Sequence, residues 1–293
     1  MAKEKIAMMT EKPGIFMGGD TPYEEAAAVI LGIPMDYTVS FRPGTRLGPL
    51  TIRNVSMGIE EYSVYLDRDL TDYTYCDCGD LSLPFGNVEK SLQLIEEASR
   101  QVMEDGKFPI FLGGEHLVTY PLLKPFLEKY PELRVIHFDA HADLRTDYYG
   151  EPNSHATVMR KISEALGPKR VYQFGIRSGT KDEFIFAKQH NHLVVEEVLE
   201  PLREVLPELK GKPVYVTLDI DVVDPAFAPG TGTQEPGGCT SREIIKAIHA
   251  LGELDVVGFD LVEVSPLTDS SERTALLAAK IVREAILSFV KIS

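Results

Sequence analysis

Short apolar runs alternate with longer amphipathic stretches along most of the 293-residue chain. Several runs are rich in β-branched residues and almost continuously apolar, as expected for strands that are buried on both faces. The pattern predicts strands over residues 26–34, 73–79, 108–114, 134–140, 170–176, 213–221 and 255–264. It predicts helices over residues 89–105, 117–130, 154–166, 181–189, 197–209, 241–251 and 271–291.

The alternation of strands and helices indicates a mostly parallel sheet with helices on both faces. We expect an α/β fold with about eight strands and a single domain that spans residues 1–293. A closed eight-fold barrel is the competing topology. We favour an open sheet, because the first 70 residues are too irregular for the start of a barrel. In either topology, ligands gather at the carboxyl ends of the strands.

The chain is acidic, with 45 Asp and Glu residues against 30 Lys and Arg residues and a formal net charge of −15. Such a surface repels nucleic acids and anionic lipids, whereas it suits small cations and metal ions. No apolar run is long enough to span a membrane. The N-terminus lacks the apolar segment of a signal peptide, and the 3 cysteines do not form a disulfide framework. We therefore expect a cytoplasmic protein.

Three potential metal ligands follow the apolar run at 134–138 directly. Asp139, His141 and Asp143 occupy alternate positions, so they share one face while the chain stays extended. An unpaired carboxylate at a buried strand end is costly, and metal coordination is the usual remedy. His137 lies one step deeper in the same strand, and we interpret it as a structural residue behind the ligands.

Two further strand ends carry similar residues. Asp219 and Asp221 close the apolar run at 213–218, and we interpret the nearby Asp224 as a turn residue before proline. His116 follows two glycines that permit a tight turn after the strand at 108–114. Because the carboxyl ends of parallel strands meet at one edge of the sheet, we expect these three candidate ligands to lie close to Asp139, His141 and Asp143.

A charge count predicts two cations. The pocket gathers four aspartates, and two unit charges about 4 Å apart repel by about 4 kcal/mol at an effective dielectric constant of 20. Two divalent ions neutralise the four charges, and six ligands suit two ions that share bridging carboxylates. Carboxylates with some imidazole favour Mn²⁺ over Zn²⁺ or Mg²⁺. Two such ions can hold a hydroxide between them, which is a nucleophile at neutral pH.

Other residues remain for the substrate. Glu263 ends the last predicted strand and could bind a cationic group, and His155 could transfer a proton to a leaving amine. The Pro- and Gly-rich loop 225–238 reads as a rigid wall of the site, with Thr231 and Thr233 as polar contacts.

At this point the sequence resembles the ureohydrolases, the arginase and agmatinase family, over nearly the whole chain. The resemblance rests on the order and spacing of five motifs: GGEH (113–116), DAHAD (139–143), SHA (154–156), LDIDVVDPAFAPGTGTQEPGG (218–238) and DLVEVSP (260–266). The segment RTDYYGEPNSHAT is similar to the version in bacterial agmatinases.

The resemblance implies a three-layer α-β-α fold with a central, mostly parallel sheet and two Mn²⁺ per subunit. It also implies that a metal-bridging hydroxide attacks a guanidinium group, giving urea and an amine. Family members are usually trimers or hexamers. The resemblance assigns the ligands as follows: His116 binds one metal and His141 the other, Asp139 and Asp219 bridge them, and Asp143 and Asp221 complete the shells.

The same resemblance assigns the substrate-handling residues. Glu263 matches the glutamate that holds the guanidinium, and His155 matches the proton shuttle. Thr233 matches a threonine that lines the site, and Asp143 matches an aspartate that also hydrogen-bonds the hydroxide. Gln234 departs from the proline of the family pattern, which we interpret as a local change of the loop.

The substrate is the open point at this stage. Arginases carry an asparagine where this chain has Arg145, which favours agmatine, the decarboxylated substrate that yields putrescine for polyamine biosynthesis. An inward-pointing Arg145 would repel the amine of agmatine, so it must point away or pair with Asp147 or Glu151. If it points inward, a guanidino acid such as 4-guanidinobutyrate becomes attractive, and arginine is a further alternative.

Three other classes compete with a ureohydrolase. A zinc deacetylase of a related fold would use one metal and leave the second set of ligands unexplained. A metal-binding regulatory relative without activity would lack a ligand or Glu263, and the sequence has them all. A passive metal store would not need His155 and Glu263.

Overall fold

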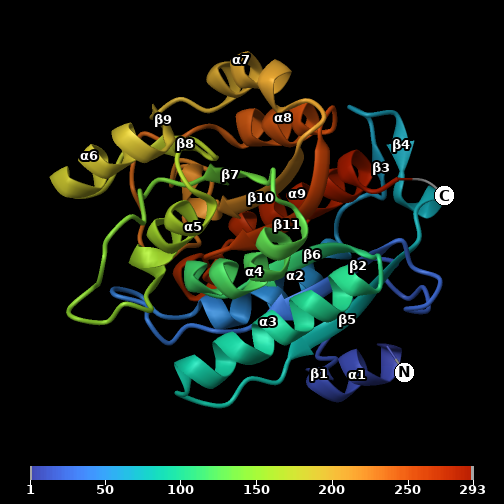
Figure 1. Cartoon of the computed structure of the whole chain (residues 1–293). Helices are drawn as coiled ribbons and strands as arrows, with labels where there is room; N and C mark the ends of the chain where they lie inside the picture. The colour runs from blue at the N-terminus through green and yellow to red at the C-terminus, as the bar shows by residue number, and fades with distance from the viewer. Residues whose placement is uncertain (1, 292–293) are drawn as a thin grey trace.

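A large sheet runs through the centre of the molecule (Figure 1). The computed structural model describes residues 2–291, and within them the sheet has nine strands. In chain order they are β1 (Thr10–Glu11), β2 (Ala28–Ile33), β5 (Tyr75–Leu81), β6 (Phe108–Gly113), β7 (Arg134–Phe138), β8 (Val171–Ile176), β9 (His192–Val195), β10 (Pro213–Asp219) and β11 (Asp255–Val262). A separate two-stranded ribbon pairs β3 (Tyr62–Ser63) with β4 (Arg68–Asp69).

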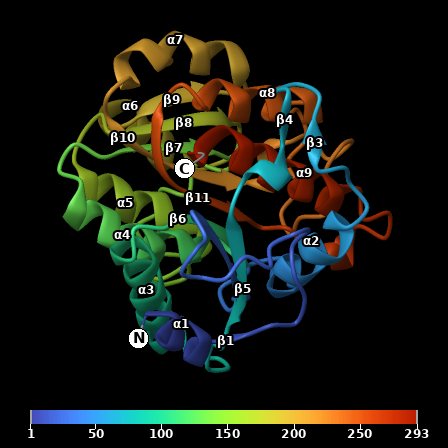
Figure 2. The ribbon, with the colours of Figure 1, turned by 90° about the vertical axis from the view of Figure 1, so that its right-hand side faces the viewer.

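The order of the strands in the sheet is β1-β5-β2-β6-β11-β10-β7-β8-β9. All neighbouring pairs are parallel except β1 and β5, which are antiparallel. The predicted open, mostly parallel sheet is therefore confirmed, and all the predicted strands are present. The sequence pattern missed the short edge strands β1 and β9, which lie at opposite ends of the sheet (Figure 2).

Helices cover both faces of the sheet and complete three layers. The described helices are α1 (Ala2–Met9), α2 (Gly48–Ser56), α3 (Val88–Glu104), α4 (Thr119–Lys129), α5 (Val158–Leu166), α6 (Lys181–His190), α7 (Leu199–Leu209), α8 (Ser241–Leu251) and α9 (Arg273–Phe289). In one layer α1, α3, α4 and α5 pack side by side, and in the other α2, α9, α8 and α7 do so. None of the helices in this part of the chain has the length and apolar character of a membrane span.

Helix α2 lies in the stretch that looked irregular in sequence. It begins with Gly48 and Pro49, and proline is favoured in the first turn of a helix because it has no N–H to leave unpaired. Its Arg53 is fully buried and donates to Asp77, with Nε 2.7 Å from Oδ2. Arg53 also forms an ion pair with Asp80, so two carboxylates of β5 compensate the buried charge.

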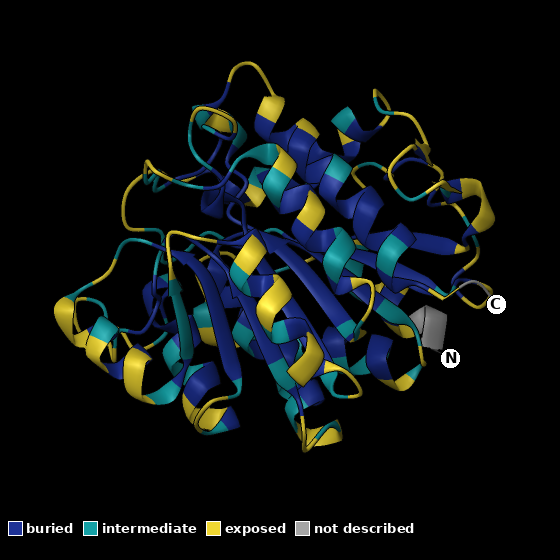
Figure 3. Cartoon of the chain, turned by 90° about the horizontal axis from the view of Figure 1, so that it is seen from above, coloured by how far each residue is buried: buried dark blue, intermediate teal, exposed yellow. Residues whose placement is uncertain are grey.

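The strands of the sheet are buried along most of their length (Figure 3). All six residues of β2 and all six of β8 are buried, which explains their continuous apolar runs. Four adjacent strands, β6, β11, β10 and β7, occupy the middle of the sheet. Because they are parallel, their carboxyl ends lie at one edge, where the predicted site residues follow them.

Candidate metal centre and pocket

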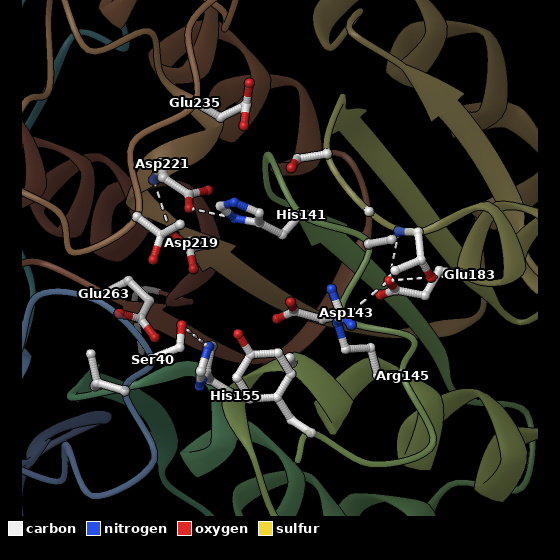
Figure 4. Close-up of a pocket in the computed structure, with 18 of the residues that line it drawn as sticks. Ser40, His141, Asp143, Arg145, His155, Glu183, Asp219, Asp221, Glu235 and Glu263 are labelled. Carbon is white, nitrogen blue, oxygen red and sulfur yellow. Dashed lines mark hydrogen bonds and ion pairs between the residues drawn. The ribbon is translucent and has the colours of Figure 1, made fainter.

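A pocket of about 300 Å³ opens at the carboxyl ends of these four strands (Figure 4). Most of the predicted site residues line it, namely His141, Asp143, His155, Asp219, Asp221, Thr233 and Glu263. The other two, His116 and Asp139, are fully buried against these residues. The structure thus brings all nine predicted residues to one place.

The end of β7 supplies Asp139, His141 and Asp143. The chain stays extended through His141, which forms a parallel bridge with Ser178, so Asp139 and His141 lie on one face as predicted. Asp143 reaches the site differently from the prediction, because its φ of 53° turns the chain out of the strand. A left-handed backbone is costly for a residue with a side chain and is often found at functional sites.

The end of β10 supplies Asp219 and Asp221. The strand ends at Asp219 and a short 3₁₀ helix follows over Ile220–Val222, so the two residues are not in one extended segment. Asp219 caps this turn, with Oδ1 2.9 Å from the backbone nitrogen of Asp221. Asp221 in turn accepts the backbone N–H of Ala140 at 2.9 Å. These bonds fix each carboxylate by one oxygen and tie β10 to β7.

The end of β6 supplies His116. Gly114 is required there, because a Cβ would lie 2.3 Å from the carbonyl oxygen of Met35. The Nε2 atom of His116 is 3.0 Å from Oγ1 of Thr217, whose own hydroxyl donates to Asp260 at 2.6 Å. Thr217 must therefore accept from Nε2–H, which leaves the lone pair on Nδ1 of His116.

That lone pair points into a group of carboxylates. Nδ1 of His116 lies 3.1 Å from Oδ2 of Asp139, 3.3 Å from Oδ2 of Asp143 and 3.4 Å from Oδ2 of Asp219. Among the described residues this buried nitrogen has no hydrogen-bond partner. Three anionic oxygens around a lone pair repel one another unless a cation lies between them, so these four atoms define a first cation position.

A second position lies next to the first. Nδ1 of His141 is 2.9 Å from Oδ2 of Asp221 and 3.6 Å from Oδ1 of Asp139. Asp139 therefore directs one oxygen to each histidine. His141, Asp139 and Asp221 form one candidate metal cluster, and His116, Asp139 and His137 form another.

His137 differs from the other two histidines. Its Nδ1 lies 3.1 Å from the amide nitrogen of Gln173, and its Nε2 lies 2.8 Å from Oδ2 of Asp139. The Gln173 amide donates to Nδ1, so Nε2 carries the proton and donates to Asp139, and no lone pair is left for a metal. The predicted role of His137 behind the ligands agrees with this geometry.

The carboxylates are strongly perturbed. Burial raises the pKa of Asp219 well above its ordinary value, and the nearby Asp221 and Asp139 raise it further. Burial and Asp139 also raise the pKa of Asp143 to about 7. Burial opposes the ionisation of Asp139 too, but the surrounding histidines, first of all His137, hold its pKa well below the usual range. The four carboxylates thus ionise together only with compensating cations.

Glu263 lies beside the two candidate metal clusters. It follows β11 with a φ of 65°, and its backbone N–H donates to the carbonyl of Gly114 at 2.9 Å. Its Oε1 accepts the backbone N–H of His116 at 2.8 Å, while the side chain lines the pocket. Burial raises the pKa of Glu263 to about 8, so a cationic ligand would favour its ionised form.

His155 lies across the pocket from Asp221 (Figure 4). It begins a 3₁₀ turn over His155–Thr157 that is capped reciprocally by Ser154 and Thr157. Its Nε2 is 3.2 Å from Oγ of Ser40. Burial lowers the pKa of His155 to about 4, so its imidazole is neutral at pH 7.

The loop 225–238 forms the wall that the sequence predicted. Thr231 and Thr233 both line the pocket. The Gln234 side chain donates to the carbonyl of Pro229, which closes the loop on itself and agrees with a local change. Asp224 accepts the backbone N–H groups of residues 226, 237 and 238, so it holds this loop rather than a metal.

Arg145 lines the pocket and is 38% exposed. Its Nε lies 3.7 Å from Oε2 of Glu183, and its guanidinium carbon lies 5.0 Å from the ring centre of Tyr148. Of the two arrangements that the sequence left open, pairing with Asp147 or Glu151 is not the one found, because Glu183 of α6 supplies the carboxylate instead. Arg145 thus forms part of the pocket wall and is held sideways against it.

Several residues of the pocket were not predicted from the sequence. Ser40, Glu183 and Glu235 line it, yet none follows a predicted metal-bearing strand directly. Glu183 had a signal of a different kind, since Thr180 and Glu183 form the capping box of α6. The same carboxylate also accepts the backbone N–H of Leu144 at 3.0 Å, which links α6 to the segment after β7.

The donor set fits manganese. Each cation position combines one imidazole nitrogen with several carboxylate oxygens, and none of the three buried cysteines lines the pocket. Oxygen-rich sites with some imidazole suit Mn²⁺ better than Zn²⁺, which prefers thiolate and imidazole. The orphaned Nδ1 of His116 is the atom that most directly requires a cation.

Comparison with known proteins places this chain in a family. Residues 26–288 match the arginase family, and the chain belongs to it. The agmatinase of Bacillus subtilis (strain 168) is 57% identical in an alignment of 280 positions that covers 94% of this chain and 97% of that protein. The match to it and to other bacterial agmatinases makes this chain a ureohydrolase enzyme.

Two further relatives are a guanidinobutyrase and an agmatine ureohydrolase. The guanidinobutyrase of Pseudomonas aeruginosa is 36% identical over 293 residues, covering 96% of this chain and 91% of that protein. The crystal structure of the agmatine ureohydrolase of Thermoplasma volcanium has a TM-score of 0.86 and 32% identity, and 97% of each chain is covered. The arginase-like fold is thereby confirmed.

Proposed function

We propose that this protein is a manganese-dependent agmatinase that hydrolyses agmatine to putrescine and urea. The observation that carries the proposal is the position of Glu263. Its carboxylate lines a pocket beside two carboxylate–imidazole clusters, and one of its oxygens is bound to the backbone of a cluster residue. A guanidinium bound to Glu263 would lie next to both cation positions. The identity to bacterial agmatinases supports agmatine as the guanidinium compound.

Two Mn²⁺ ions would occupy the two cation positions. His116, Asp143 and Asp219 would hold one ion, His141 and Asp221 the other, and Asp139 would bridge them. Asp219 would be the second bridge, as the resemblance implies. When bound, such a pair of ions lowers the pKa of water and supplies a hydroxide nucleophile at neutral pH.

The side chains of the pocket do the remaining work. Glu263 binds and orients the guanidinium, and such orientation can lower the barrier by several kcal/mol, up to roughly 7–11 kcal/mol for the best-oriented reactions. The net reaction replaces the amine at the guanidinium carbon by oxygen, and the amine leaves with an added proton. His155 is neutral at pH 7, so it can accept a proton and pass it to this amine. Thr233 offers a polar contact at the wall.

A guanidino acid is the second candidate substrate. Arg145 lines the pocket and could bind a carboxylate, and a guanidinobutyrase is among the relatives. Two contacts favour agmatine instead. Glu183 compensates the charge of Arg145, and Tyr148 holds its guanidinium against a ring. Arginine is a third and weaker candidate, since its carboxylate would also need Arg145.

We also infer that the enzyme acts as a homo-oligomer, a trimer or a hexamer, in the cytoplasm. The oligomer rests on the family resemblance of the sequence, and the location rests on the 3 cysteines, too few for a disulfide framework and typical of a reducing compartment. Light scattering coupled to size-exclusion chromatography measures the mass of the assembly. The mass of one 32.6 kDa chain would contradict the proposed oligomer.

The decisive experiment measures urea release from the Mn²⁺-loaded protein with agmatine, arginine and 4-guanidinobutyrate side by side. We expect the highest kcat/KM with agmatine. A higher kcat/KM with 4-guanidinobutyrate would assign Arg145 to substrate binding. Absence of urea from all three substrates would contradict the proposed function, and the metal content of the same sample would show whether the metal assignment survives.

A further inference from the structure

A buried glutamate that no metal cluster includes connects the ends of β2 and β6. Glu115 is fully buried and precedes His116. Its backbone N–H donates to the carbonyl of Met35 at 2.7 Å. Its carboxylate accepts the backbone N–H of Tyr37 at 2.8 Å and that of Thr38 at 3.0 Å. A buried carboxylate needs such donors, and here all of them belong to the loop that follows β2.

The side chain of Thr38 extends this connection. Its hydroxyl donates to Oε2 of Glu115, so the oxygen of Thr38 can act only as an acceptor toward other groups. It accepts the backbone N–H of His155 at 3.1 Å and lies 3.5 Å from Nδ1 of the same residue. Glu115 therefore determines how the hydroxyl of Thr38 faces His155.

The same loop contacts the other side of the imidazole. Ser40, two residues after Thr38, places its Oγ 3.2 Å from Nε2 of His155, as the dashed line in Figure 4 shows. His155 is thus contacted at its backbone and its Nδ1 side by Thr38 and at its Nε2 side by Ser40, while Oγ of the adjacent Ser154 also lies 3.4 Å from Nδ1. The oxygen of Thr38 can only accept, so it favours the tautomer with a proton on Nδ1, and the lone pair on Nε2, beside Ser40, can then take up the proton that passes to the leaving amine.

From these contacts we propose that Glu115 and Thr38 are positioning residues for His155. They set the orientation and tautomer of the imidazole that transfers the proton to the departing amine. The inference rests on the proposed function, in which His155 has this task. A purely structural role would instead make Glu115 an anchor of the loop, with no particular effect through His155.

The first test uses Thr38→Val, which keeps the shape of the side chain and removes the hydroxyl. We expect kcat for agmatine to fall about ten- to hundred-fold, since misplacement of a reacting group by about 1 Å costs on the order of a hundred-fold. We expect KM and bound manganese to change less than two-fold. Thr38→Ser should restore most of kcat, because it keeps the hydroxyl. Thr10→Val, a change at the distant edge strand β1, should leave kcat unchanged.

A double-mutant cycle with His155→Asn separates positioning from structure. If Thr38 acts through His155, then Thr38→Val lowers kcat in the wild type and has no further effect beside His155→Asn. Glu115→Gln should behave in the same way, with its metal content measured because it adjoins His116. Equal losses in both backgrounds would overturn the proposal and leave Glu115 as an anchor of the loop.

Failure of the positioning role can be distinguished from failure of the proposed function. If His155→Asn retains the kcat of the wild type, the task assigned to His155 is wrong. If no substrate yields urea, crystal structures of the manganese-loaded wild type and Thr38→Val still compare the position of the imidazole. An imidazole that does not move or rotate in Thr38→Val would overturn the positioning role by itself.

Discussion

The backbone N–H of His116 donates a hydrogen bond to Oε1 of Glu263 at 2.8 Å. This bond joins the turn that follows β6 to the residue directly after β11, and these strands are neighbours in the sheet. The distance between the first cation position and the carboxylate for the guanidinium is therefore set by the main chain. Flexible side chains alone would hold it less firmly.

Replacement of Glu263 by glutamine should separate binding of the guanidinium from binding of metal. Glutamine still accepts the N–H of His116 through its carbonyl oxygen, but it has no charge for a guanidinium. We expect kcat/KM for agmatine to fall about a hundred-fold, corresponding to about 3 kcal/mol for a charged hydrogen bond. Urea release and elemental analysis check this together. Unchanged turnover would remove Glu263 from the site.

Loss of a bridging carboxylate should cost both metal and activity. Asp139 directs its two oxygens to different histidines, so Asp139→Ala removes a ligand from both cation positions. We expect activity below about one thousandth of the wild type and less than half of the manganese. Asp219→Ala should act in the same direction. Asp147→Ala, at an exposed position, is the matched control. Full manganese content in Asp139→Ala would contradict the bridging assignment.

The stability of the metal-stripped protein should fall as the pH rises from 6 to 9. The folded-state pKa is about 7 for Asp143 and about 8 for Glu263, above the ordinary values of 3.8 and 4.5. A group with a raised pKa stabilises the fold fully only below its unfolded-state pKa, and that contribution is lost as the pH rises through the folded-state value. Each of the two groups lowers the free energy of unfolding by up to about 1.4 kcal/mol for each pH unit in this window.

Bound manganese should reverse this trend, because the ligands must lose protons to bind it. Thermal unfolding of the stripped and loaded protein at several pH values measures both effects. We expect the melting temperature of the stripped protein to fall as the pH rises. The difference in melting temperature between the loaded and the stripped protein should grow over the same range. A melting temperature that rises from pH 6 to 9 without metal would contradict the raised pKa values.

Arg145→Gln tests whether Arg145, in the wall of the pocket, contributes to substrate specificity. Arg145 is held by Glu183 and Tyr148, so its loss should change kcat/KM for agmatine less than about three-fold, within the range of an exposed ion pair. Arg160→Gln, which removes an exposed pair with Glu164 on α5, is the matched control. A large loss confined to 4-guanidinobutyrate would show that Arg145 binds carboxylates.

The central part of the fold could be predicted because its strands are buried on both faces and read as apolar runs. The edge strand β9 could not, since its four residues are partly exposed and carry no such run. Helix α2 was hidden by Gly48 and Pro49, which more often mark a loop. Both β9 and α2 depend on pairing or packing with other segments of the chain, which a local sequence pattern does not reveal.

The site was predictable to the extent that its residues follow strands directly. A carboxylate immediately after a buried run, such as Asp139 or Asp219, carries a desolvation cost that a bound cation offsets, so its position points to a site. The partner of Arg145 lies 38 positions away on α6, and Thr38 meets Glu115 across 77 positions. Contacts of this kind depend on how loops approach each other, and local sequence patterns do not contain that information.

Because of the strand order, the residues that form the two cation positions become available at different times during synthesis. β7 and β10 are direct neighbours, so the position of His141 needs only residues made by the end of the Asp221 turn. The position of His116 also needs β6, which joins this part of the sheet only through β11, the last strand to be made. A nascent chain can therefore complete the position of His141 early, but it gains the position of His116 only when β11 joins β6 to the rest of the sheet.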